Sequence, residues 1–201
     1  MQLKKLASFL VVLAGLFAAS LFSASGPAVA ADKENTMVIT LKDGDVTIAL
    51  RPDLAPKHVA QIKKLVRDGA YDNVAFHRVI DGFMAQTGDV KFGNMKKGFN
   101  PEAVGTGGSD LPDLPAEFSQ SEQFTRGVIG MARSQDPNSA NSQFFIMFAP
   151  APNLDGQYTI VGKVVGGMDL VDKIKKGDEA DNGTVSDPDR MIKVRIAADG
   201  K

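Results

Sequence analysis

The chain has 201 residues, of which 43% are hydrophobic and 23% are charged, and its formal net charge is −1. This composition is typical of a globular protein and excludes a disordered chain, and the near-neutral charge argues against nucleic acid or an anionic membrane as a partner. Cysteine is absent and there are only two histidines, which excludes disulfides, thiolate metal sites and a cysteine nucleophile and leaves no histidine-rich metal site.

The first 30 residues have the pattern of a cleavable export signal. Lys4 and Lys5 form a basic start, an uncharged apolar run extends to Phe22, and a Gly-Pro pair precedes the small-x-small sequence Ala28-Val29-Ala30. A retained membrane anchor is the alternative, because the apolar run is close to the shortest length that spans a bilayer. We expect cleavage, and therefore a protein that works in a bacterial periplasm or is secreted.

The segments that follow alternate short apolar runs with turn residues. Residues 37–41 and 46–50 are β-branched and apolar runs around Asp43-Gly44, which predicts a hairpin. Pro56 begins a predicted helix that reaches Asp68 and carries one apolar face. Residues 91–125 are rich in Gly, Pro and Asp and show almost no periodicity, which is typical of a functional or disordered loop. Further strands are predicted at 75–80, 83–86, 128–132, 144–148, 159–165 and 191–196, and a second helix at 168–175.

Many short strands and two helices predict a mainly β protein. No repeat or linker divides residues 31–201, so we expect one domain after the signal. A closed antiparallel β-barrel with helices at its ends fits this pattern, because closure removes exposed strand edges. A β-sandwich with appended helices is the alternative that the pattern leaves open.

Four segments combine large apolar side chains with a strategically placed polar residue. They are Phe76-His77-Arg78 through Asp89, Gly130-Met131-Ala132-Arg133-Ser134, Ser142-Gln143-Phe144-Phe145-Ile146 and Asn153-Leu154-Asp155-Gly156-Gln157-Tyr158. Four blocks of the chain resemble the signature blocks of the cyclophilin family of peptidyl-prolyl cis-trans isomerases. The blocks occur in the order of the family, with consistent spacing, and they cover nearly all of residues 37–196. They are Phe76-His77-Arg78 through Gly88-Asp89, Asn141-Ser142-Gln143-Phe144-Phe145-Ile146, Leu154-Asp155-Gly156 and Gly162-Lys163-Val164.

The resemblance implies a closed eight-stranded antiparallel β-barrel capped by two α-helices, with a groove for an X-Pro segment of another chain. It implies an isomerase that rotates X-Pro peptide bonds and assists the folding of exported proteins. Rotation breaks no bond, so we expect neither a cofactor nor a metal. The expected partners are proline-containing segments of unfolded or partly folded proteins. We expect a monomer with no stable membrane association after signal cleavage.

The resemblance also implies the residues of the site. Arg78 matches the catalytic arginine, whose guanidinium would bond the prolyl nitrogen only when the amide is twisted. Gln86 matches the side chain that steadies this arginine and the substrate. The expected substrate-binding residues are Phe83, Met84, Ala132, Arg133, Gln143, Phe145, Leu154 and Tyr158.

Two alternatives and two departures from the family remain. A non-catalytic module that holds proline segments is disfavoured by the intact Arg78 and Gln86. For an exported hydrolase, the chain lacks a nucleophile motif and a metal-ligand cluster.

Asn153 stands where many eukaryotic members carry a tryptophan that binds cyclosporin, so we expect weak binding of this drug. Arg133 stands where an asparagine is usual, and we expect its charge to favour acidic residues beside the proline.

Overall fold

The computed structural model describes residues 32–200, which form one compact unit. The expected export signal at residues 1–30 lies outside the described residues and stays a prediction. Among residues 32–200, no helix has both the length and the apolar character needed to cross a membrane.

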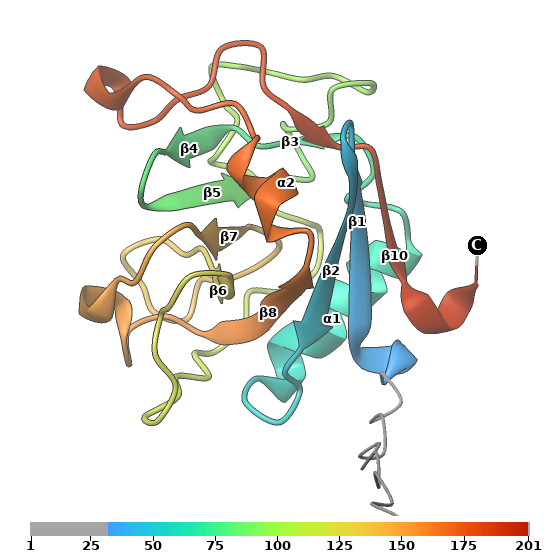
Figure 1. The fold of residues 1–201 in the computed structure, drawn as a ribbon, viewed down its shortest axis with the longest axis vertical. Helices are drawn as coiled ribbons and strands as arrows, with labels where there is room; N and C mark the ends of the chain where they lie inside the picture. Colours follow the sequence, from blue (N-terminus) through green and yellow to red (C-terminus); the bar gives the residue numbers. More distant parts are fainter. Residues whose placement is uncertain (1–31, 201) are drawn as a thin grey trace, which may run out of the picture. The chain divides into compact units, whose positions relative to one another are not determined.

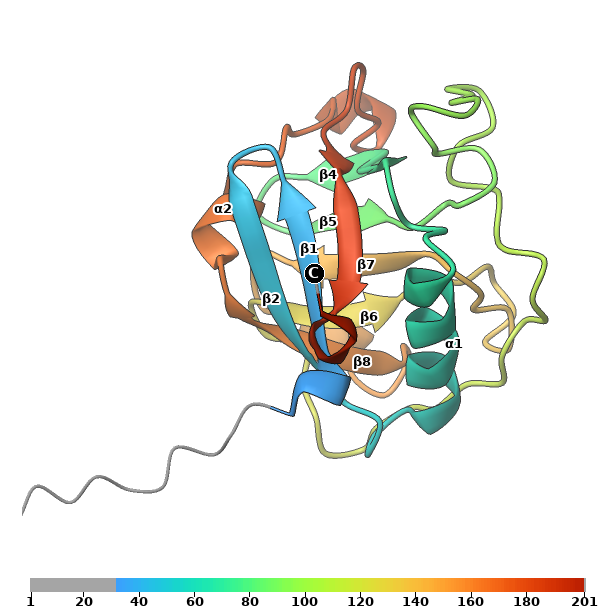
Figure 2. The ribbon, with the colours of Figure 1, turned by 90° about the vertical axis from the view of Figure 1, so that its right-hand side faces the viewer.

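Eight antiparallel strands form one strongly curled sheet in the order β10-β1-β2-β8-β6-β7-β5-β4. The part made of β10, β1 and β2 runs across the part made of β5, β7 and β6 (Figures 1 and 2). The strands are β1 (Thr36–Leu41), β2 (Gly44–Leu50), β4 (Arg78–Ile80), β5 (Met84–Thr87), β6 (Val128–Met131), β7 (Phe144–Met147), β8 (Ile160–Gly166) and β10 (Lys193–Ile196).

The structure confirms a mainly β fold with eight antiparallel strands and two helices, but the expectation of a closed barrel was wrong. Strands β4 and β10 are the two edges of the sheet, and within the described residues they do not pair with each other. The runs predicted as single strands at 75–80 and 191–196 are each divided in two. Their first parts, β3 (Val74–Ala75) and β9 (Arg190–Met191), pair with each other in a separate two-stranded sheet.

The free edge of β4 is covered by an irregular segment instead of by β10. The backbone N–H of Val79 donates to the carbonyl of Gly183, and that of Gly177 donates to the carbonyl of Val79. This segment therefore satisfies backbone groups that barrel closure would otherwise have paired. The result is a half-barrel in which this segment protects the β4 edge.

The β1–β2 hairpin and the helix α1 (Pro56–Arg67) form where the sequence predicts them. Leu41 pairs with Gly44 across the two-residue turn Lys42-Asp43, so the turn lies one position before the predicted Asp43-Gly44, and Gly44 begins β2 with a φ of +143°. Helix α1 has proline in its first turn and no side-chain cap from its own N-cap residue. Its buried face is made of His58, Val59, Gln61, Ile62, Leu65 and Val66.

Helix α2 (Met168–Asp172) is shorter than the predicted helix at 168–175. Four 3-10 helices complete the regular structure: η1 (Lys33–Asn35), η2 (Pro152–Leu154), η3 (Glu179–Asp181) and η4 (Ala197–Asp199).

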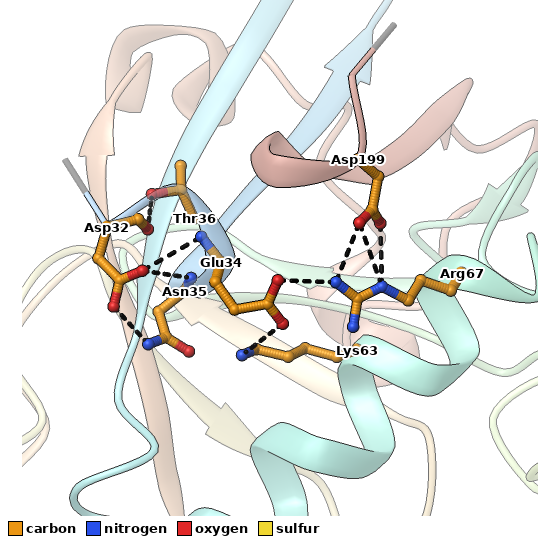
Figure 3. Close-up of polar contacts among 7 residues, drawn as sticks. All are labelled: Asp32, Glu34, Asn35, Thr36, Lys63, Arg67 and Asp199. Carbon is orange, nitrogen blue, oxygen red and sulfur yellow. Dashed lines mark hydrogen bonds and ion pairs between the residues drawn. The ribbon is translucent and has the colours of Figure 1, made fainter.

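Ion pairs connect both ends of the described chain to α1 (Figure 3). Glu34 of η1 accepts hydrogen bonds from Arg67 at 2.8 Å and from Lys63 at 3.3 Å, and Arg67 also donates to both carboxylate oxygens of Asp199. These bonds lower the pKa of Glu34 and of Asp199. Because the pairs are exposed, they orient the ends more than they stabilise the fold.

The apolar side chains form two cores, one on each face of β5, β6 and β7. The larger core lies against α1 and includes Ile129 and Ile146, whereas the second contains their strand neighbours Val128 and Phe145. Side chains alternate between the two faces of a strand, and burial on both faces explains why these strands are continuous apolar runs. The candidate site lies over the second core, which is made of Met84, Phe124, Val128, Phe145, Met147, Ala151, Leu154 and Ile160.

Candidate active site

Strand register places the main candidate residues in one row across four neighbouring strands. Arg78 of β4 is opposite Gln86 of β5, Gln86 is opposite Phe145 of β7, and Phe145 is opposite Gly130 of β6. Directly opposite residues of antiparallel strands project from the same face. The sheet thus brings a guanidinium, an amide and an aromatic ring side by side, although Phe145 is far from Arg78 and Gln86 in the sequence.

A cavity of about 230 Å³ opens over this row. It is lined by nearly all the residues that the sequence predicts for the site, namely Arg78, Phe83, Met84, Gln86, Ala132, Arg133, Phe145, Leu154 and Tyr158. The remaining predicted residue, Gln143, lines a neighbouring groove of about 580 Å³ that shares Gln86, Ala132 and Arg133 with the cavity.

The floor of the cavity is apolar and rigidly supported. Met84, Phe145 and Leu154 are buried, and the ring of Phe145 is stacked on Phe124 with centroids 5.8 Å apart. A Cβ atom on Gly130 would lie 2.5 Å from the ring of Phe145. Only glycine therefore lets this ring lie across β6. Sequence reasoning singled out the segment that contains Gly130 without giving this glycine a role, and it missed Phe124.

Arg78 stands at the rim of the cavity with its charge uncompensated by a carboxylate among residues 32–200. Its Nε donates to the carbonyl oxygen of Asn182 at 3.0 Å, and its Nη2 donates to the side-chain oxygen of Asn182 at 2.9 Å. Nη1 donates to Oε1 of Gln86 at 3.3 Å. Partial burial lowers the pKa of Arg78, but a guanidinium remains charged in proteins.

Two glutamines connect Arg78 to the long loop. The Nε2 of Gln86 donates to Oε1 of Gln143 at 2.9 Å, and the Nε2 of Gln143 donates to the carbonyl oxygens of Gly105 and Gly107 at 3.0 and 2.8 Å. Each amide thus accepts on its oxygen and donates from its nitrogen, which fixes both orientations. The arrangement holds the oxygen of Gln86 toward the guanidinium.

Residues 36–196 match the family described as cyclophilin type peptidyl-prolyl cis-trans isomerase/CLD. The chain belongs to the cyclophilin family. It is 70% identical over 188 residues to a protein of Brucella suis biovar 1 named probable peptidyl-prolyl cis-trans isomerase, with 94% of this chain and 95% of that protein covered. It is 40% identical over 143 residues to peptidyl-prolyl cis-trans isomerase-like 2 of Cryptococcus neoformans, with 69% of this chain and 23% of that protein covered.

Solved cyclophilin structures share the fold. Cyclophilin AquaCyp293 from Hirschia baltica is 27% identical with a TM-score of 0.70, and the match covers 85% of this chain and 76% of that one. A Cryptosporidium parvum cyclophilin, crystallised in the presence of the dipeptide Ala-Pro, is 27% identical with a TM-score of 0.67, and the match covers 80% of this chain and 98% of that one. These findings confirm the predicted family, and the chain is a peptidyl-prolyl cis-trans isomerase.

In this cyclophilin part of the loop at residues 91–125 lines the groove beside the cavity, namely residues 105–109 and Asp113. The buried carboxylate of Asp89 accepts four backbone hydrogen bonds, from the N–H groups of Lys91, Phe92, Gly105 and Gly107. Backbone donors satisfy a buried carboxylate well. The carboxylate therefore holds the two glycine peptides that accept hydrogen bonds from Gln143, and no periodic pattern in residues 91–125 predicts this arrangement.

His77 precedes Arg78 but is buried beneath the loop. A Cβ on Gly105 would lie 3.3 Å from the imidazole. Burial lowers the pKa of His77, since the charged imidazolium loses its hydration. Both ring nitrogens of His77 are buried without a hydrogen-bond partner in the described part of the chain, and an imidazole enclosed in this way is poorly placed to act as a general base.

Proposed function

We propose that the cavity over β4, β5, β7 and β6 is the isomerase site, and that Arg78 is its catalytic residue. The observation that carries the proposal is the place of the guanidinium. It is half-buried beside the apolar floor of the cavity, and it lacks a carboxylate partner among residues 32–200. A cation in this position is free to act on a ligand instead of serving an internal ion pair.

The chemistry of the reaction requires such a donor. The planar amide has a rotation barrier of about 18–20 kcal/mol, which comes from the partial double bond between carbon and nitrogen. Twisting the bond localises a lone pair on the prolyl nitrogen. An N–H group of Arg78 that donates to this lone pair binds the twisted state and not either planar form, and only such differential binding accelerates a reaction.

The apolar floor and Gln86 complete the proposed site. Phe83, Met84, Phe145 and Leu154 would hold the proline ring and exclude water from the nitrogen, which strengthens the bond from Arg78. The side chain of Gln86 would steady the guanidinium through the hydrogen bond at 3.3 Å. The Ala-Pro dipeptide named with the Cryptosporidium parvum cyclophilin supports proline-containing ligands for this family.

We also propose that the substrates are unfolded or partly folded exported proteins. The proposed place of action is the periplasm or the exterior, where the chain works as a monomer that is not anchored in the membrane. The support for export is the signal pattern of residues 1–30. Mass determination of the protein purified from a periplasmic fraction tests this, because cleavage after Ala30 predicts a mature chain that begins at Ala31.

Replacing Arg78 with alanine or lysine tests the catalytic assignment. A charge-assisted hydrogen bond contributes about 1.5–3 kcal/mol, so kcat for a proline peptide should fall roughly 10- to 150-fold in R78A. Lysine keeps the charge but not the planar fork of donors, so R78K should also be impaired. Peptide affinity should change little in either variant. The matched control is Arg195→Ala, since Arg195 lies on β10 outside the cavity.

Turnover in R78A within twofold of the unaltered protein would overturn the assignment of Arg78. It would favour the alternative of a module that binds proline segments without a catalytic donor in this cavity. Loss of turnover in R195A as well would indicate a general effect of removing surface charge.

A further inference from the structure

The side chain of Arg133 lies over the ring of Tyr158 at the border of the cavity. The guanidinium carbon is 4.5 Å from the ring centroid, which is within the range of a cation–π contact. Both residues line the cavity, and both are half-buried. The contact therefore joins two parts of the cavity border that come from different segments of the chain.

Hydrogen bonds to the backbone fix the guanidinium in this position. Nε and Nη2 both donate to the carbonyl oxygen of Gln157, at 3.3 and 3.1 Å. Nη1 donates to the carbonyl oxygens of Ser134 at 2.8 Å and Gln135 at 3.4 Å. A guanidinium has five N–H donors in one rigid plane, so the protein itself uses most of them. Arg133 thereby connects the segment after β6 to the residue just before Tyr158.

Tyr158 in turn forms a wall against the aromatic floor. Its ring is nearly perpendicular to that of Phe145, at 84° with centroids 5.8 Å apart, and to that of Phe124, at 84° and 6.5 Å. Edge-to-face contacts of this kind are favourable and directional. Rotation of Tyr158 would change the width of the space above Phe145, where the proposed function places the proline ring.

We infer that Arg133 is a positioning residue for substrate binding, which acts by holding Tyr158 upright as one wall of the pocket. This inference rests on the proposed isomerase site. It replaces the expectation that the charge of Arg133 selects acidic residues beside the proline, because the donors that would bind a carboxylate are bonded to backbone carbonyls. Arg133 should therefore affect the binding of all proline peptides alike.

Arg133→Ala and Arg133→Lys separate the two roles. Lysine keeps the positive charge but cannot form the planar fork to the carbonyl of Gln157. If Arg133 positions Tyr158, both variants raise KM about 2- to 5-fold, the range of a cation–π contact at a partly exposed site. The rise should be equal for Ala-Pro and Glu-Pro peptides, and kcat should stay within about twofold. Arg195→Ala is again the matched control.

Tyrosine fluorescence reports directly on the position of the Tyr158 ring. The chain has no tryptophan and two tyrosines, so in a Tyr71→Phe background the emission comes from Tyr158 alone. Release of the ring should raise its quenching by acrylamide in both Arg133 variants above that of the protein with Arg133. If Tyr71→Phe is unstable, the same comparison is made with Tyr71 present, because that ring is fully buried and shielded from the quencher.

The inference is overturned if R133K behaves like the unaltered protein in both KM and quenching, or if only Glu-Pro peptides lose affinity. Either result would assign Arg133 a role through its charge alone. Failure of the proposed function is a separate outcome. Full activity of R78A would show that the catalytic site lies elsewhere, whereas the quenching of Tyr158 would still report its contact with Arg133.

Discussion

Replacing Gly130 with alanine tests whether the aromatic floor is as tightly packed as the structure shows. A Cβ atom there would lie 2.5 Å from Cζ of Phe145 and 2.6 Å from Cε1 of Phe124. Carbon atoms prefer separations of about 3.5–4.0 Å, so each ring would have to retreat by about 1 Å. Phe124 is enclosed in the second core, whereas Phe145 borders the cavity. We therefore expect the ring of Phe145 to move into the proposed proline pocket.

This displacement sets the size of both effects. Forcing a methyl group into a packed core costs about 1–3 kcal/mol. A domain of this size loses about 2–4 °C of Tm per kcal/mol, so Tm should fall by about 2–12 °C. Misplacement by about 1 Å in an active site can lower activity by about 100-fold. We expect kcat/KM for a proline peptide to fall by about 10- to 100-fold in G130A.

Circular dichroism melting and a peptide isomerisation assay measure the two effects, with Gly166→Ala as the matched control. Gly166 also lies in a strand, but its Cβ would meet only Thr47, at an ordinary contact distance of 3.5 Å. G166A should therefore melt within about 2 °C of the unaltered protein and keep its activity. If G130A matches G166A in both assays, the reasoning about the floor is refuted.

Three further predictions concern other parts of the molecule. Burial lowers the pKa of His77 below the ordinary 6.5, so the unfolded chain takes up this proton first and stability is lost as the pH falls below about 6.5. Tm measured from about pH 8 to 5 should decline less steeply in His77→Asn, and parallel profiles would contradict this. Glu117 accepts bonds from the backbone N–H of His58 at 3.1 Å and from its Nδ1 at 2.7 Å, and thereby caps α1. Glu117→Gln should lower Tm by about 1–8 °C, and an unchanged melting curve would show that the cap contributes nothing. Cyclosporin should inhibit the protein weakly, and Asn153→Trp should tighten inhibition about 10-fold or more by adding apolar surface; nanomolar inhibition of the unaltered protein would refute this.

Local patterns predicted the elements whose partners are near in sequence. The Asp43-Gly44 pair identified the β1–β2 hairpin, although the turn itself is Lys42-Asp43, and the apolar residues of α1 identified its buried face. Such signals suffice because they depend on backbone conformation and on the period of the element. The extent of α2 was overpredicted, since apolar spacing continues past Asp172 although the helix does not.

Local sequence patterns could not predict which strands form the edges of the sheet. Residues 75–80 and 191–196 are both continuous strand-like runs, and nothing within either run marks the point where the chain leaves one sheet for the other. Pairing between β3 and β9 joins residues more than one hundred positions apart, and β4 and β10 are left as the two edges of the larger sheet. Whether the barrel closes therefore depends on which distant strands pair and not on the strand propensity of either run.

The amino-acid sequence alone determined the family, because several ordered blocks with constant spacing rarely arise by chance, and it determined which side chains gather at the cavity. Tertiary structure decided how those side chains are held. The carbonyl and side chain of Asn182 orient Arg78, the carbonyl of Gln157 engages Arg133, and the absence of a side chain at Gly130 makes room for Phe145. Each of these contacts joins segments that meet only in the folded chain, and hydrogen bonds and steric contacts act over a few ångströms, so no local pattern could record them.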